Sequence, residues 1–317
     1  MFPVFDEEAY RFFKVQEAAL WNSNEMDFSR DVEQYESFKP ELKRIIDYVY
    51  AFFSSADGAI NENVMLRFYR ECDTFEQKCF YLTQMYIECV HAETYSLTIN
   101  TLIKDPVKRE QLFKAIETIP IVDMKMKWIE KWLESDLPRQ HRLLAFICVE
   151  GLLFQSSFFY IFWFRSKGLL NNIVFSNEQI SKDENIHCSF AITLFNRLPK
   201  IEQCIAHSIV DEAVKIEFAF IDEVTPNKVD DLDPNDAKNY VKTLANIILN
   251  RCGYEILYKD TTRLPNWTYE ITSQQKNNFY EVRVGSYKQF SLNSVLDWRN
   301  RIDKKKDVYK DIQSIEF

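Results

Sequence analysis

Glycine is scarce in this chain: 5 of its 317 residues are glycine, and neither GxGxxG nor GxxxxGK[ST] occurs. Loops that cradle phosphates need glycines where the backbone approaches the ligand, so a nucleotide-binding loop of these kinds is excluded. Basic residues are outnumbered, with 39 Lys and Arg against 48 Asp and Glu, and the only basic run is the short Lys304-Lys305-Lys306. A nucleic-acid groove needs clustered positive charge, so no nucleic-acid partner is expected.

Cysteine spacing gives no sign of a disulfide framework or a zinc site. The chain has seven cysteines, an odd number without a CxxC pair, and Met1 is followed by Phe2-Pro3 rather than by a basic and then apolar leader. These features predict a reduced, cytoplasmic protein. Apolar residues make up 46% of the chain, which is enough for a sizeable core and excludes a disordered chain.

Helical periodicity dominates the sequence and few strands suggest themselves, so we expect an all-α fold. The expected helices lie near residues 39–56, 62–72, 75–103, 106–118, 138–167, 176–195, 200–224 and 235–253. The expected breaks are Ser54 to Gly58, Lys104 to Pro106, Gly168, and Thr225 to Asn227. After about Tyr287 the composition changes to Ser, Asn, Asp and Lys, which predicts a helical domain over 1–287 and a flexible C-terminal tail over 288–317.

One apolar run from Leu143 to Phe164 has two interpretations. It is 22 residues long with Glu150 as its only charge, which is long enough to cross a bilayer. The alternative is a helix buried on all sides in a bundle, and we favour it because no second span exists and a mid-membrane glutamate is costly. No membrane association is therefore expected. A buried Glu150 must then be paired, hydrogen-bonded or bound to a metal.

Two of the four histidines follow a glutamate by three residues: Glu88 precedes His91, and Glu184 precedes His187. Residues three apart on a helix project from one face, so each pair offers a carboxylate and an imidazole to one point. Both pairs lie in strongly apolar helical segments, where an acid without a partner is unfavourable. The two pairs are therefore candidate metal ligands.

A di-metal carboxylate bundle uses two such Glu-x-x-His helices and one acid from each of two further helices. Glu150 supplies one of these acids. Asp57 is the candidate for the other, because it ends the apolar run from Ile45 to Ala56 ahead of the first pair, as Glu150 lies ahead of the second. Taken alone, Asp57 is better explained as a turn residue that ends a helix before Gly58, and the other five candidates favour its role as a ligand. Four carboxylates and two imidazoles suit iron or manganese better than zinc or copper.

Tyr95 shares the ligand face of its helix, because it lies seven residues after Glu88, almost two full turns. Most tyrosines at such positions are core residues. Three apolar residues on the ligand sides of two other helices would give this one a dry pocket that protects a reactive species from water. These residues are Phe154, Phe158 and Ile180.

Six ordered motifs carry a resemblance to a known family. They are WNSNEMDFSRD (21–31), ADGAINENV (56–64), ECVHAETYS (88–96), VEGLLFQSSF (149–158), FSNEQISKDENIHCSF (175–190) and RVGSYKQF (283–290). Over residues from about 15 to 290 the chain resembles the small, radical-generating subunit of class I ribonucleotide reductase, in its eukaryotic and viral branch. The resemblance implies a ferritin-like helical bundle with a di-metal carboxylate centre.

The resemblance also implies the cofactor, namely two iron ions per chain that share an oxo bridge when oxidised. The implied ligands are Asp57, Glu88 and His91 for one iron and Glu150, Glu184 and His187 for the other. Glu88 and Glu184 would bridge the ions. Tyr95 falls where the family keeps its stable tyrosyl radical, which argues against a mixed-metal variant that lacks this tyrosine, although the ligand set leaves manganese possible.

In that family the radical passes to a cysteine of the large subunit, where ribonucleoside diphosphates are reduced to deoxyribonucleotides. The implied route runs from Tyr95 and His91 through Asp183 and Trp21 to Tyr287 in the tail. The family also implies a homodimer whose acidic, Phe-terminated C-terminal tail binds the large subunit. Here the tail ends in Phe317 but is otherwise atypical, and Gln155-Ser156 replaces the usual Ser-Gly.

Two other functions remain open from the sequence. A ferritin-like di-metal oxidase or oxygenase would share the six ligands, and an open channel with a replaced tyrosine would favour it. A non-catalytic partner subunit would keep the fold and lose ligands. The presence of Tyr95 and of all six ligands favours radical storage over both.

Overall fold

The computed structural model describes residues 3–63 and 67–268, and within these ranges the chain is helical, with one isolated β-bridge between Val229 and Leu232. The all-α prediction is confirmed. The long helices are α1 (Glu7–Ala18), α3 (Pro40–Asn63), α4 (Phe75–Leu102), α7 (Pro120–Leu133), α8 (Arg139–Cys148), α9 (Phe154–Ser166), α10 (Asn171–Arg197), α11 (Gln203–Val224) and α12 (Pro234–Arg251). Short helices are α2 (Val32–Ser37), α5 (Pro106–Phe113), α6 (Ala115–Thr118) and the 3-10 turns η1 (Ser23–Glu25) and η2 (Phe28–Asp31). A π-helical segment, η4 (Val149–Leu153), joins α8 to α9.

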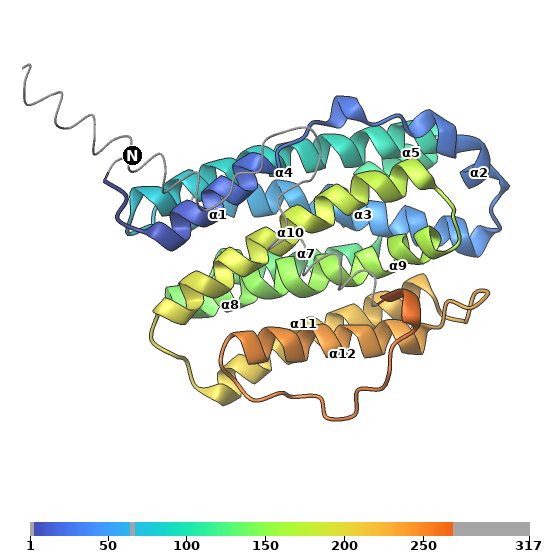
Figure 1. Ribbon diagram of the computed structural model, residues 1–317. Coiled ribbons are helices and arrows are strands. Elements are labelled where there is room, and N and C mark those ends of the chain that lie inside the picture. The colour runs from blue at the N-terminus through green and yellow to red at the C-terminus, as the bar shows by residue number, and fades with distance from the viewer. Residues whose placement is uncertain (1–2, 64–66, 269–317) are drawn as a thin grey trace, which may run out of the picture. The chain divides into compact units, whose positions relative to one another are not determined.

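The helices pack side by side as a bundle (Figure 1). Helix α4 lies between α1 and α3, and α10 packs on α8 and α9. Helix α7 contacts both α3 and α11, and α12 pairs with α11. The site described below lies where α3, α4, α10 and the π segment face one another.

Capping residues explain several helix ends. Helix α4 ends at Leu102, and α5 begins at Pro106, whose N-cap Asp105 accepts a hydrogen bond from the backbone N–H of Val107. Gly168 follows the end of α9 with a φ of +66°, a left-handed conformation that favours glycine. These breaks, and the one after Val224, lie where the sequence predicts them.

Other element predictions were wrong. Helix α3 continues through Ser54 to Gly58 as far as Asn63, and the hydroxyls of Ser54 and Ser55 donate to the Ala51 carbonyl within the helix. Of the helix expected over 62–72, the described residues are 62–63, which close α3, residues 67–68, which are π-helical, and residues 69–72, of which 69–71 form turns. Helices α1, α2 and α7 were missed.

The apolar run from Leu143 to Phe164 is a core helix. It lies within the continuous helical stretch Arg139–Ser166, whose most apolar part is completely buried by the surrounding protein. The interpretation as a buried helix is confirmed. All seven cysteines are free thiols, as expected for a reduced protein.

Candidate metal centre

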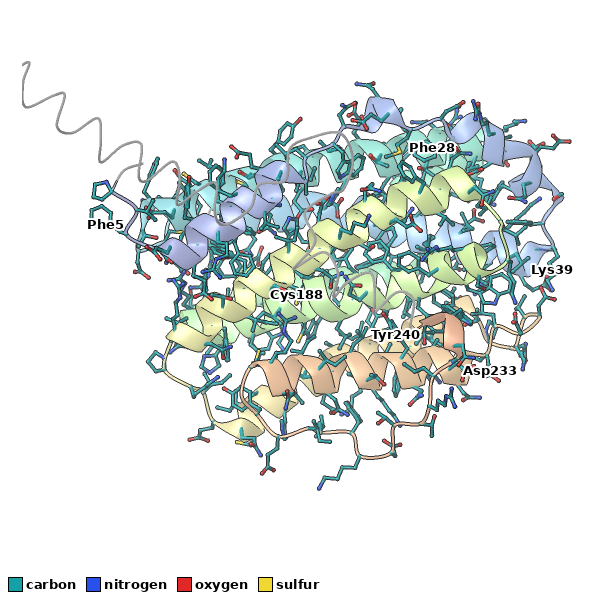
Figure 2. All side chains as sticks on the ribbon, viewed as in Figure 1. Phe5, Phe28, Lys39, Cys188, Asp233 and Tyr240 are labelled. Atoms are coloured by element: carbon teal, nitrogen blue, oxygen red, sulfur yellow. The ribbon has the colours of Figure 1, made fainter. Side chains whose placement is uncertain are left out.

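Four elements bring the six predicted ligands to one place in the core. Asp57 comes from α3, one Glu-x-x-His pair from α4, Glu150 from the π segment, and the other pair from α10. Each of the six residues is at most 1% exposed. Cys188, which directly follows His187, is labelled in Figure 2 on the central part of α10. The donor atoms form two groups within which all atoms lie within 4.8 Å of one another. These groups are Asp57, Glu88 and His91, and Glu88, Glu150, Glu184 and His187.

Glu88 and Glu184 lie between the two histidines. His91 Nδ1 lies 3.1 Å from Glu88 Oε2 and 3.0 Å from Glu184 Oε1. His187 Nδ1 lies 3.0 Å from Glu88 Oε1 and 3.1 Å from Glu184 Oε2. Each glutamate therefore presents one oxygen to each imidazole, which is the arrangement that a bridging carboxylate between two ions requires.

Asp57 and Glu150 complete the centre from opposite sides, and several of their oxygens lack hydrogen-bond partners among the described residues. These are both carboxylate oxygens of Asp57 and Oε2 of Glu150. Burial, followed by the charge of Glu88 on Asp57 and of Glu184 on Glu150, raises the pKa of both carboxyls well above their usual values. Buried carboxylates without donors are costly, and cations would remove that cost. Four carboxylates and two imidazoles fit two ions of iron or manganese.

The π segment determines where Glu150 projects. The backbone N–H of Phe154 donates to the carbonyl of Val149, an i to i+5 bond that widens the helix by one residue. Gly151 packs so closely on α10 and α12 that an added Cβ would lie 2.6 Å from Cys188 Sγ. Any larger residue here would force the Cys188 side chain to shift, so glycine suits this close approach.

Tyr95 is completely buried and its hydroxyl has no hydrogen-bond partner among the described residues. Burial, and then the charge of Asp57, raises the pKa of this phenol well above its usual value. Its ring stacks on Phe53 at 4.7 Å between centroids. Phe53 in turn contacts Phe154 at 5.6 Å and Phe158 at 5.1 Å. The phenol thus lies in an apolar environment beside the candidate metal ligands.

The three residues predicted to form the pocket wall lie in the core, and an aromatic neighbour of Tyr95 was missed. Phe154, Phe158 and Ile180 are all completely buried. The ring that stacks directly on Tyr95 is Phe53, one turn before Asp57 on α3. Residues a whole number of turns apart on one helix share a face, which is the rule that selected Tyr95. The same rule would have selected Phe53 if α3 had been expected to continue through Asp57.

The structure also brings Trp21, Asp183 and His91 together. Trp21 Nε1 donates to Asp183 Oδ2 at 2.8 Å, and His91 Nε2 lies 3.1 Å from the same oxygen. The indole and imidazole rings are stacked with centroids 5.9 Å apart. Asp183 therefore holds the outer nitrogen of His91 while Nδ1 faces the centre. Tyr287 and the segment 283–290 lie outside the described residues.

Two glutamines at the centre were missed by sequence reasoning. Gln84 Nε2 donates to Glu88 Oε1 and Glu150 Oε1, at 3.2 Å each. The amide nitrogen of Gln16 lies 2.5 Å from His187 Nε2, and a half-turn of the amide would present its oxygen to a protonated Nε2. The one available signal was the position of Gln84, one turn before Glu88.

Fold and site together define the class: a ferritin-like helical bundle with a di-metal carboxylate centre. The sequence model of the family "Ribonucleotide reductase, small chain" matches residues 1–265. The ribonucleoside-diphosphate reductase small chain of Variola virus is 38% identical over 299 residues, 94% of this chain and 93% of the relative. A ribonucleoside-diphosphate reductase small chain of Arabidopsis thaliana is 38% identical over 304 residues, 95% of this protein and 88% of the relative. The chain belongs to the ribonucleotide reductase small-chain family.

Solved structures share the fold at lower identity. A putative class I ribonucleotide reductase from Bacillus halodurans aligns with a TM-score of 0.78 at 17% identity, covering 85% of this chain and 100% of that one. The ribonucleotide reductase homodimer of Saccharomyces cerevisiae gives 0.75 at 24% identity, covering 87% and 89%. The dimanganese(II) protein NrdF of Streptococcus sanguinis gives 0.70 at 18%, covering 81% and 92%. These likenesses support the ferritin-like fold.

Proposed function

We propose that this chain, as a small subunit of ribonucleoside-diphosphate reductase, binds two metal ions at the six-ligand centre and stores a radical on Tyr95. The single observation that carries the proposal is the contact network of Glu88 and Glu184, each of which faces both histidines beside a partnerless buried phenol. Two iron ions are the proposed cofactor, with manganese as the alternative that the ligand set also accepts.

The bound ions would supply the redox chemistry with dioxygen that removes one electron and one proton from tyrosine. The contribution of the chain is to hold the phenol beside them. After burial, the charge of Asp57 is the strongest influence on the phenol of Tyr95, and both raise its pKa and so keep it protonated in the resting protein. Phe53, Phe154 and Phe158 exclude water from the phenol, which protects a radical from reduction.

The proposed exit of the radical is the contact path from His91 through Asp183 to Trp21. Asp183 Oδ2 is shared by the imidazole and the indole, so a proton and an electron can move along hydrogen-bonded and stacked groups. We further propose that Tyr287 continues the route and that the tail, residues 288–317, binds the large subunit. A homodimer in the cytoplasm is the proposed working form.

Electron paramagnetic resonance tests the assignment of Tyr95. The protein is loaded anaerobically with iron, exposed once to oxygen, and compared with Tyr95→Phe. Tyr81→Phe is the matched control, because Tyr81 lies on the same helix, seven residues before Glu88 as Tyr95 lies seven after, and is equally buried with a partnerless hydroxyl. A tyrosyl doublet is expected in the parent and in Tyr81→Phe, and none in Tyr95→Phe.

Other results would contradict the proposal. A doublet that survives in Tyr95→Phe would place the radical elsewhere. Oxidised iron without any radical in the parent would favour the oxidase or oxygenase alternative, and absence of iron binding would favour a non-catalytic partner subunit.

A further inference from the structure

A buried ion pair lies outside the metal centre and has no place in the chemistry described so far. Lys125 of α7 and Glu217 of α11 are both completely buried, with Nζ 2.5 Å from Oε1. The ammonium group also lies 3.4 Å from the centroid of the Phe52 ring and 4.1 Å from that of Phe220. Removing two charges from water is expensive, and apolar residues of similar size often serve stability equally well. The pair therefore requires an explanation other than stability.

The second carboxylate oxygen of Glu217 connects the pair to the π segment. The Ser156 hydroxyl donates to Glu217 Oε2, and the same Oγ lies 3.0 Å from the carbonyl oxygen of Leu153. Leu153 is the last residue of the π segment. The hydroxyl of Ser157 donates to that carbonyl at 3.3 Å, so the single proton of the Ser156 hydroxyl remains with Glu217. Ser156 thus links the end of the π segment to the buried charges.

The opposite side of the π segment is fixed by packing. At Gly151 the backbone is so close to Cys188 and Ile248 that a Cβ there would lie 2.6 Å and 3.2 Å from their side chains. The segment is therefore held between α10 and α12 on one side and the Ser156, Glu217 and Lys125 contacts on the other. Its backbone sets the direction of Glu150. Gln84 Nε2 donates to Oε1 of that carboxylate, and Oε2 has no hydrogen-bond partner among the described residues.

We propose that Lys125, Glu217 and Ser156 form a positioning triad that holds the π segment so that Glu150 points into the metal centre. Lys125 holds Glu217 in place through the buried pair, and Glu217 holds Ser156, which lies three residues after Leu153, the last residue of the π segment. The triad touches no metal ion and acts through Glu150 alone. This inference rests on the proposed function, because it assigns the triad to one of the two proposed metal positions, the one built on Glu150, Glu184 and His187.

A second triad of the same chemistry provides a matched control. Lys108 Nζ lies 2.6 Å from Asp47 Oδ2, and the Tyr35 hydroxyl donates to Asp47 Oδ1 at 2.6 Å. It also joins a lysine, a buried carboxylate and a hydroxyl, but its three residues belong to α2, α3 and α5 rather than to the elements around the π segment. Removing its hydroxyl in Tyr35→Phe leaves a buried carboxylate short of one donor, as Ser156→Ala does.

The experiment measures manganese(II) binding to the metal-free protein without oxygen, with free ion followed by electron paramagnetic resonance. The parent is expected to bind two ions per chain. Ser156→Ala should bind one ion as the parent does and the second about tenfold more weakly, the lower end of losses for residues that orient metal ligands. Ser156→Thr, which keeps the hydroxyl, should bind both normally, and so should Tyr35→Phe. Melting curves of Ser156→Ala and Tyr35→Phe should fall by similar amounts.

Each alternative outcome has a defined meaning. Parental binding of both ions by Ser156→Ala would overturn the triad and leave the metal centre intact. Equally weakened binding of both ions in Ser156→Ala would also overturn it, because the effect would then be general destabilisation. The same loss of affinity in Ser156→Thr or Tyr35→Phe would overturn it too, because the effect would then be destabilisation or packing. A parent that binds fewer than two ions would overturn the proposed centre itself and the triad with it.

Discussion

Metal loading should change the thermal stability of this protein more than any single contact does. In the metal-free state four carboxylates share one buried site with two imidazoles, and burial together with neighbouring carboxylates raises the pKa of Asp57 and Glu150. Cations relieve this crowding only in the folded chain, because the six ligands come from four separate elements. Binding must therefore stabilise the fold.

The size of the effect follows from linkage. An ion that binds only the folded chain at one thousand times its Kd contributes about 4 kcal/mol, so two ions contribute roughly 8 kcal/mol. An unfolding entropy of about 2.1 cal/mol/K per residue, over roughly 260 structured residues, gives about 0.55 kcal/mol/K. The melting temperature should accordingly rise by about 15 °C on loading with iron(II) or manganese(II).

Differential scanning calorimetry of metal-free and loaded protein measures this rise, and Glu150→Gln sharpens the test. Neutralising Glu150 removes a buried acid, so the metal-free variant should melt above the metal-free parent. The same change removes a ligand, so the loaded variant should lose up to about 7 °C of the metal-induced rise, the share of one ion. Glu130→Gln, at an exposed position on α7, is the control and should change neither curve. Identical curves for metal-free and loaded parent would refute the six-ligand assignment, and so would a Glu150→Gln variant that is destabilised equally in both states.

Two further outcomes are expected. The Asp183→Asn variant should still form the radical on Tyr95. Together with the large subunit it should reduce nucleotides at least about tenfold more slowly, because the outer hydrogen bond of His91 is weakened. A parallel loss of radical yield in the spin count would instead assign Asp183 to metal assembly. The metal-free protein should lose stability steadily from about pH 5 to pH 9, because Asp57 and Glu150 have raised pKa values in the fold. His187 acts in the same direction: burial lowers its pKa, but two facing glutamates raise it to about 9, so its stabilisation is complete below 6.5 and is lost as the pH rises through 9. Urea unfolding across this range measures the slope, and stability that rises with pH would contradict it.

The sequence located the candidate ligands because their geometry is local. Glu88 and His91, like Glu184 and His187, are one helical turn apart, and spacing within one helix already decides that they share a face. Asp57 was identified for the wrong structural reason. It was expected to end a helix, whereas α3 continues past it, with the hydroxyls of Ser54 and Ser55 bonded to the helix backbone.

The features that sequence reasoning missed depend on contacts between distant segments. Gln16 reaches His187 across 171 residues, a pairing that no spacing rule predicts. Helix α7 escaped notice because Lys125 interrupts its apolar face, and only the buried partner Glu217 explains a lysine there. Local periodicity predicts which residues share a face, but it does not predict which faces meet.

The two candidate ligand histidines differ in what holds their outer nitrogens, and this difference makes the two sides of the centre chemically distinct. Both present Nδ1 to the shared glutamates, so toward the metals they are equivalent. On the outer side, His91 meets the carboxylate of Asp183, which also binds the indole of Trp21, whereas His187 meets the neutral amide of Gln16. An acid can accept a proton as an electron passes, and an amide cannot. Under the proposed function, a radical can therefore leave on the His91 side, while Gln16 orients its histidine and provides no further step.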